Sequence, residues 1–224
     1  MAIQDLIGMH KGNPLAAEVQ AYIANERVDN KLKYIGIISH QNAGKDFVAN
    51  YIAKNVERKC QVVKFATKLT QVVAAALCVD DLSLFQDRIW KEKKIFQWQN
   101  KIVSARDVQI SLGTDILRGL VDDNIWVTAF SNAYNDPDIL YIISDLRFLN
   151  EFKFVQDNSG IVIFIDNHEA AENQRRKEAG VVHSSEELTW DLHHGVQQPD
   201  YILDNNDYGN PQPLQDLLTF FSTV

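Results

Sequence analysis

The stretch 33–50 (KYIGIISHQNAGKDFVAN) constrains the fold of this chain more than any other. It opens with the apolar run 34–38, which is typical of a buried strand. A polar turn follows, and apolar residues then recur at helical spacing, at Val48, Ile52 and Val56. A strand, a loop and a helix in this order form the context that a phosphate-binding loop requires.

The turn matches the phosphate-loop pattern G-x-x-x-x-G-K-[ST] in part. In that pattern, backbone N–H groups hold phosphate oxygens and the lysine neutralises their charge. Gly44 and Lys45 occupy their expected positions, but Ser39 replaces the first glycine and Asp46 replaces the metal-binding hydroxyl. On this stretch alone, a tight strand-to-helix turn with a solvated lysine is an equally good interpretation.

Composition limits the class of protein. The chain has 224 residues, of which 46% are hydrophobic and 23% charged, which suits one α/β domain with an inserted subdomain. A formal net charge of −8 is atypical of a nucleic-acid-binding surface, so we expect no direct nucleic-acid binding but allow a local basic pocket for a small anion. Without a leader-like segment or a membrane-length apolar run, we expect a cytoplasmic protein without membrane contact.

Alternating apolar strands and amphipathic helices predict an α/β fold with a parallel sheet of about five strands flanked by helices. The expected strands are 34–38, 60–65, 139–144, 161–165 and 200–204, and the main expected helices are 67–78, 104–130, 148–156 and 214–221. We expect residues 1–33 to form a helical extension that docks on a core domain of residues 34–224.

Two segments interrupt this alternation. More than seventy mostly helical residues separate the second strand from the third, which predicts a helical insertion at about 66–135. Within it, the region 80–100 mixes aromatic residues with Lys91, Lys93 and Lys94, a pattern that we interpret as a solvated helix face. The polar segment at about 167–187 is interpreted as a mobile lid.

Six stretches, in order along the chain, together resemble the bacteriophage deoxynucleoside monophosphate kinases, which are P-loop kinases of the adenylate-kinase-like branch. They are AGKDFVA at 43–49, ARDVQISLGTDILR at 105–118, DDNIWV at 122–127, ISDLRFLNE at 143–151, HSSE at 183–186 and DYILDN at 200–205. The resemblance implies a P-loop kinase fold whose helical insertion binds the nucleoside monophosphate. It also implies ATP and Mg²⁺ as cofactors, small nucleotides as substrates and, for a phage protein, the host cytoplasm. Whether the chain forms a homodimer is left open.

The resemblance assigns a donor side to the site. ATP phosphates would be held by the loop residues Asn42, Ala43, Gly44, Lys45, Asp46 and Phe47. Asp46 and Asp145 are the expected metal-side carboxylates, with Asp145 acting on Mg²⁺ through water. The alternative for Asp145 is a cap for the helix that follows it. Arg147 would contact phosphate with a planar fork of donors, because phosphoryl transfer needs charge neutralisation and positioning.

On the acceptor side, Arg106 and Gln109 are three residues apart and would share one helix face. Arg106 would contact the acceptor phosphate and Gln109 a base edge. Asp115 and Arg118 continue the same stretch, and an ion pair between them is the structural alternative to a substrate role. In the lid, Arg175 and Arg176 would supply mobile charges to the transferring group, or else form an exposed basic turn.

Departures from the family keep two other interpretations open. Ser39, Ala43 and Phe47 stand at the family's Gly, Ser and Thr positions. Loss of one hydroxyl bond to a charged group costs roughly 1.5–3 kcal/mol. The chain could therefore be a catalytically weakened nucleotide-binding or interaction protein. The third interpretation is a related P-loop kinase for another small phosphorylated acceptor, such as phosphomevalonate.

Overall fold

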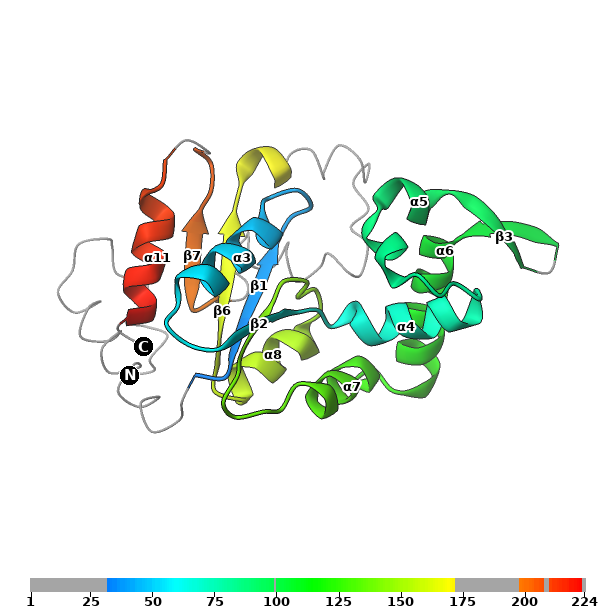
Figure 1. Ribbon diagram of the computed structural model, residues 1–224, viewed down its shortest axis with the longest axis horizontal. Helices are drawn as coiled ribbons and strands as arrows, with labels where there is room; N and C mark the ends of the chain where they lie inside the picture. The colour runs from blue at the N-terminus through cyan, green and yellow to red at the C-terminus, as the bar shows by residue number, and fades with distance from the viewer. Residues whose placement is uncertain (1–31, 99, 172–197, 208–209, 223–224) are drawn as a thin grey trace.

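The computed structural model describes residues 32–98, 100–171, 198–207 and 210–222 (Figure 1). The helix expected within residues 1–33 and most of the expected lid, including Arg175 and Arg176, lie outside the described residues.

The described residues build one five-stranded parallel sheet with the order β2-β5-β1-β6-β7. Its strands are β1 (Tyr34–Ser39), β2 (Cys60–Val63), β5 (Leu140–Ile143), β6 (Gly160–Asp166) and β7 (Tyr201–Asp204). The three inner strands are nearly continuous buried apolar runs, because both faces of the sheet are covered by helices. The predicted fold class, a parallel sheet of five strands flanked by helices, is confirmed.

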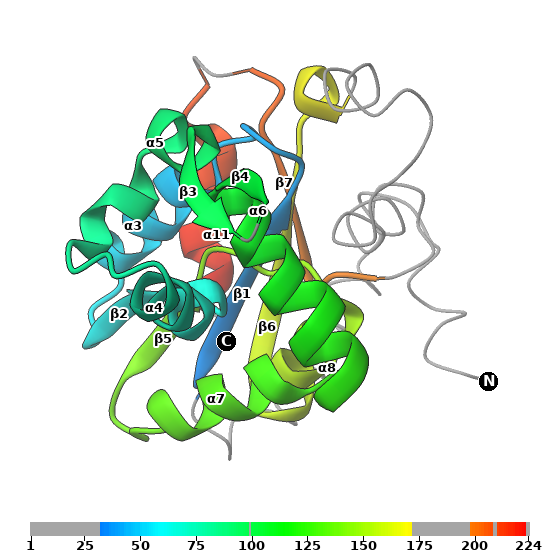
Figure 2. The same ribbon diagram turned by 90° about the vertical axis from the view of Figure 1, so that its right-hand side faces the viewer.

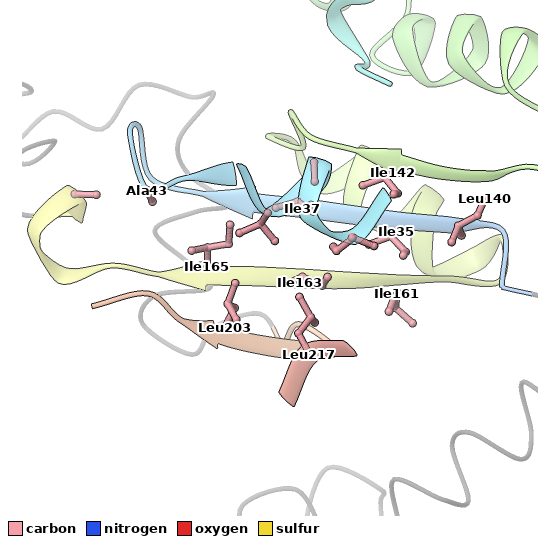
Figure 3. Close-up of a cluster of buried hydrophobic side chains, with 14 residues drawn as sticks. Ile35, Ile37, Ala43, Leu140, Ile142, Ile161, Ile163, Ile165, Leu203 and Leu217 are labelled. Carbon is pink, nitrogen blue, oxygen red and sulfur yellow. The ribbon is translucent and has the colours of Figure 1, made fainter. Parts of the chain in front are cut away.

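Each face of the sheet has its own hydrophobic core. On one face, side chains of the strands pack against α3 (Lys45–Asn55) and α11 (Gln212–Ser222), as the cluster in Figure 3 shows. On the other face, an aromatic-rich cluster packs against α7 (Ile125–Ala133) and α8 (Leu149–Asp157). The strands are thereby fixed in a three-layer arrangement, and their carboxyl ends meet at one edge, where α/β proteins bind ligands.

The segment between β2 and α7 forms a separate lobe beside the sheet (Figure 1). It consists of α4 (Ala66–Ala76), the 3₁₀ turn η1 (Leu82–Gln86), α5 (Arg88–Glu92), the strands β3 (Lys94–Trp98) and β4 (Lys101–Ser104), α6 (Ala105–Ile110) and the π-helical η2 (Ser111–Val121). Its own small core is lined by Val73, Ala74, Phe85, Ala105 and Val108. In Figure 2 this lobe faces the viewer.

Two local expectations for this lobe are wrong. The region expected as one helix face at 80–100 contains β3, the first strand of the antiparallel hairpin β3–β4, whose strands hydrogen-bond to each other. The helix expected across 104–130 is broken before α7, where the carboxylate of Asp122 accepts a hydrogen bond from Asn124 N at 2.9 Å. Such an Asx turn offers the backbone an alternative to the helix.

Among the described helices, none is long and apolar enough to cross a membrane.

Gly160 marks a close approach that allows a test of the fold. A Cβ at this position would lie 2.4 Å from the carbonyl oxygen of Val155 and 2.6 Å from its Cγ1. We therefore expect Gly160→Ala to lower the free energy of unfolding by about 1–3 kcal/mol, measured by urea denaturation. The control is Gly119→Ala, whose Cβ would make an ordinary 3.4 Å contact. Equal losses in the two variants would contradict the close-approach argument.

Candidate active site

The loop after β1 has the backbone conformation of an anion-binding turn. Asn42 (φ 69°) and Gly44 (φ 91°) both adopt left-handed conformations, which asparagine and glycine tolerate best. Gly44 is also the N-cap of α3 and supplies no capping side chain. The N–H groups at the start of a helix point out of its N-terminus and carry partial positive charge, so a turn of this kind suits a negatively charged ligand.

Ser39 and Phe47, two of the residues that depart from the family's loop pattern, are accommodated locally. The buried hydroxyl of Ser39 donates to the carbonyl oxygen of His40 at 3.0 Å. The ring of Phe47 is 64% exposed and stacks on Tyr51 one turn along α3, with 6.3 Å between ring centroids. The Ser39 hydroxyl is thus bonded within the loop, and the Phe47 ring lies along the helix.

Asn205, which follows the last strand, braces the loop from outside. Its side-chain amide donates to the carbonyl oxygen of Ala43 at 2.9 Å. Its backbone is held in turn, because Asn205 N donates to Asp166 O at 2.9 Å and the Asn167 side chain donates to Asn205 O at 2.6 Å. The ends of β6 and β7 therefore fix the carbonyl next to Gly44.

Lys45 and Asp46 begin α3 at the mouth of the loop. Lys45 is half-buried, whereas the side chain of Asp46 is 62% exposed. The Asp46 carboxylate lies 3.3 Å from the ammonium of Lys64, which follows β2. This ion pair connects the start of α3 to the segment that follows β2.

Asp145 follows β5 and caps α4. Its Oδ1 accepts a hydrogen bond from Phe65 N at 2.7 Å, and its Oδ2 accepts one from Ala66 N at 3.0 Å. The helix that it caps therefore precedes it in the sequence, and the alternative of a cap for the following helix is wrong. Burial raises the pKa of Asp145, against the two N–H donors and the positive charges of Arg147 and Lys64.

Arg118 and Glu151 form a buried ion pair between the lobe and the sheet domain. Arg118 Nη2 lies 2.6 Å from Glu151 Oε1, and the two side chains are only 6% and 4% exposed. The guanidinium also donates to Asp123 O and Asn150 Oδ1 and lies over the ring of Phe148 at 3.9 Å. Burial, followed by the charge of Asp145, raises the pKa of Glu151 to about 7, against the opposite effect of Arg118.

The alternative of an ion pair between Arg118 and Asp115 is therefore wrong, because Arg118 pairs with Glu151. Asp115 is exposed, and its Oδ2 lies 3.5 Å from the hydroxyl of Ser111. The α-helical rule that residues three apart are neighbours does not apply in η2, which bonds residues five apart, as Asp122 N donates to Leu117 O. A substrate role for Arg118 or Asp115 stays a prediction.

Glu151 also orients the segment that carries Arg147. Its Oε2 accepts hydrogen bonds from Arg147 N at 2.9 Å and from Phe148 N at 3.2 Å. The carboxylate thus bridges the Arg118 guanidinium and the backbone of Arg147. Arg147 is held at the end of β5 by the carboxylate of Glu151 on α8, which is itself paired with Arg118 of the lobe.

At this edge of the sheet, the charges of three half-buried cations act on a fourth, Lys91. The four are Lys64 after β2, Lys91 on α5, Arg106 on α6 and Arg147 after β5, called here the cationic cluster. Burial and then the charges of Arg106, Lys64 and Arg147 lower the pKa of Lys91. Two members come from the lobe and two from the sheet domain, so the cluster lies where these parts meet.

The remaining predicted residues have these positions. Gln109 lies on α6 with Arg106 and donates from its amide to Thr70 Oγ1 on α4 at 3.2 Å, and its base-reading role stays a prediction. Arg175 and Arg176 are outside the described residues. Within the described residues, no three His, Cys, Asp or Glu side chains gather in a metal-binding arrangement.

Sequence reasoning missed three groups that the structure brings to this edge. Lys64 and Lys91 carry no local signal that separates them from solvated lysines. Asn205 stands directly after a strand in DYILDN, a position at which a polar side chain reaches the ligand edge of a parallel sheet. That position was the one available signal.

A family model described as deoxynucleotide monophosphate kinase matches residues 61–189. The phosphate loop lies before the matched span. A relative in Acanthamoeba polyphaga mimivirus, provisionally named deoxynucleotide monophosphate kinase, is 28% identical over 145 residues, covering 59% of this chain and 72% of the relative. This relative belongs to a giant virus and not to a bacteriophage.

Solved structures with a similar arrangement include the dephospho-CoA kinase of Campylobacter jejuni, with 11% identity, 84% of this chain and 96% of that chain covered, and a TM-score of 0.45. The shikimate kinase of Bacteroides thetaiotaomicron has 12% identity, coverages of 86% and 99%, and a TM-score of 0.41.

The buried pair of Arg118 and Glu151 makes a stability prediction. We expect Arg118→Met to lower the free energy of unfolding by about 3–5 kcal/mol, because Glu151 would be left buried without its cation. The control is Arg88→Met, which breaks the exposed i, i+4 pair with Glu92 (3.1 Å) and should cost at most about 0.5 kcal/mol. Urea denaturation measures both losses, and similar values would contradict the buried-pair assignment.

Proposed function

The chain belongs to the deoxynucleotide monophosphate kinase family, and we propose that it transfers the γ-phosphoryl group of ATP to the phosphate of a deoxynucleoside monophosphate. Family membership makes the chain a member of a group of phosphotransferases. The acceptor, the donor and the residues that act on them are the content of the proposal.

The observation that carries the proposal is the position of the cationic cluster near the phosphate loop. The Lys64–Asp46 ion pair joins the two at 3.3 Å. A transfer between two phosphates brings together a donor and an acceptor that are both anions, and their repulsion must be offset by fixed positive charge. An acceptor with a neutral hydroxyl and no phosphate would need only the charge at the loop. Two separate groups of phosphate-binding donors therefore favour a phosphorylated acceptor.

On the donor side, the N–H groups at the start of α3 and the ammonium of Lys45 bind the ATP phosphates. The Asn205 brace keeps the loop in the conformation that presents these donors. Arg147, held through its backbone by Glu151, meets the transferring group with a planar set of donors. The family resemblance adds Arg175 and Arg176, which lie outside the described residues, as further charges for the transferring group.

On the acceptor side, Arg106 binds the acceptor phosphate and Gln109 contacts the base. Gln109 retains donor and acceptor capacity beyond its single bond to Thr70, because a carboxamide offers two donor hydrogens and an oxygen. Both residues lie on α6, whose first turn is fixed by the reciprocal hydrogen bonds of Ser104 and Asp107.

The carboxylates of Asp46 and Asp145 suit Mg²⁺, which proteins bind through one or two carboxylates, with waters and substrate phosphates completing the shell. An exposed Asp46 and a half-buried Asp145 fit such an open arrangement. When bound, the ion neutralises charge on the phosphate oxygens. The protein's own part is to hold these carboxylates in place, for Asp145 through its bonds to Phe65 N and Ala66 N.

The direct test is ADP formation from ATP and Mg²⁺ with each of the four standard deoxynucleoside monophosphates. We expect turnover with at least one of them and a loss of roughly 10²- to 10³-fold in kcat/KM for Lys45→Ala, because a positioned charge on the transferring phosphates is removed. The matched control is Lys54→Ala, which changes a lysine in the last turn of the same helix and should leave turnover intact.

Two results would replace the proposal. Binding of ATP or of a monophosphate without turnover would identify a nucleotide-binding protein and focus attention on Ser39 and Phe47. Turnover with another phosphorylated metabolite but with none of the four nucleotides would keep the kinase and change its acceptor.

A further inference from the structure

Lys91 differs from the two lysines beside it. The sequence suggested that Lys91, Lys93 and Lys94 share one solvated face, but only Lys91 is half-buried, and the other two are exposed. The three residues have the same side chain and lie within four positions of one another. Their difference in burial therefore comes from the fold and not from composition.

The helix that carries Lys91, α5, is only five residues long but is held at its N-terminus by a cap and along its side by aromatic packing. The Asp87 carboxylate caps it by accepting hydrogen bonds from Ile89 N at 2.8 Å and Trp90 N at 3.3 Å. The Trp90 ring packs edge-on against Phe85 and Phe96, at centroid distances of 5.2 and 5.9 Å. The Asp87 cap and the packing of Trp90 together fix the position of α5, and with it the position of Lys91.

The charges that act on Lys91 are mostly of its own sign. Arg106, Lys64 and Arg147 all disfavour its protonated form, and so does burial. Among the described charges that act on Lys91, only that of Glu92 favours the protonated form of the lysine. The Glu92 carboxylate also lies 3.1 Å from Arg88 Nε, with which it forms an ion pair. Folding thus concentrates positive charge at a place where an anion would relieve the repulsion.

We propose that Lys91 binds the phosphate of the acceptor nucleotide, as a second cation from the lobe beside Arg106. The assignment rests on the proposed function and adds a binding residue to it. The acceptor side is favoured over the ATP side because α5, which carries Lys91, packs against α6, which carries Arg106. The ligand chemistry is that of a phosphate monoester dianion.

Steady-state kinetics test the assignment. For Lys91→Met we expect the KM for the deoxynucleoside monophosphate to rise roughly ten- to hundredfold, as for a lost hydrogen bond between charged groups, with the KM for ATP within about twofold of the wild type. Lys91→Arg keeps the charge and should restore most of the affinity. Lys93→Met is the matched control and should change neither constant.

A proton-linkage measurement supplies a readout that a structural role would not change. An ammonium with a lowered pKa loses its proton at a lower pH than an ordinary lysine does, and a bound dianion favours its protonated form. Calorimetric titration of the monophosphate at about pH 9, in two buffers of different ionisation enthalpy, should reveal proton uptake by the wild type. Lys91→Met and Lys91→Arg should lack this uptake, because neither can take up a proton there.

The outcomes separate this inference from the proposed function. Unchanged monophosphate KM and unchanged proton uptake in Lys91→Met would overturn the role of Lys91 while leaving the kinase activity in place. If the wild type has no turnover but binds a deoxynucleoside monophosphate more tightly than the matching deoxynucleoside, the proposed function fails. The role of Lys91 then stands if Lys91→Met abolishes that preference, and falls if it does not. A wild type without this preference would overturn both.

Discussion

The arrangement of the site depends on the two hydrogen bonds that the Asp145 carboxylate accepts. The carboxylate stands at the end of β5 and accepts hydrogen bonds from the two residues that lead from β2 into α4. Because α4 is the first helix of the lobe, this cap sets the direction in which the lobe leaves the sheet. Arg106 and Lys91 belong to that lobe, so their position relative to Lys45 and Arg147 depends on a bond made by neither of them. The buried pair of Arg118 and Glu151 provides a second connection between the same two parts.

The net charge of the protein says little about the charge at this edge. The chain as a whole carries a formal charge of −8, yet the charges of Lys64, Arg106 and Arg147 all act on Lys91. An anionic ligand near the strand ends responds to the nearby fixed charges, while distant acidic side chains are screened within about 10 Å at ordinary salt. The acidic surface is therefore compatible with a strongly cationic site.

The sequence predicted what short-range physics determines. The strands around Ile37, Ile142 and Ile163 were predictable because a strand buried on both faces must be apolar throughout. The phosphate loop was predictable because it requires glycine before lysine at a strand-to-helix turn. The hairpin β3–β4 was missed because its strands are only five and four residues long and, in the described part of the chain, pair only with each other. Long-range pairs such as Arg118 with Glu151, and the burial of Lys91 but not Lys93, depend on packing that no local pattern encodes.

The Asn205 brace has a consequence for the order in which the protein can be assembled. The donor amide and the Ala43 carbonyl are separated by 162 residues of chain, and the strand that brings Asn205 to the loop is the edge strand β7. During synthesis the loop emerges long before its brace, so a growing chain carries an unbraced phosphate loop until residues beyond β7 have left the ribosome. Contacts of such high sequence separation also form late in folding, because the entropy of closing the intervening chain must be overcome first. The loop is therefore fully braced only in a nearly complete molecule.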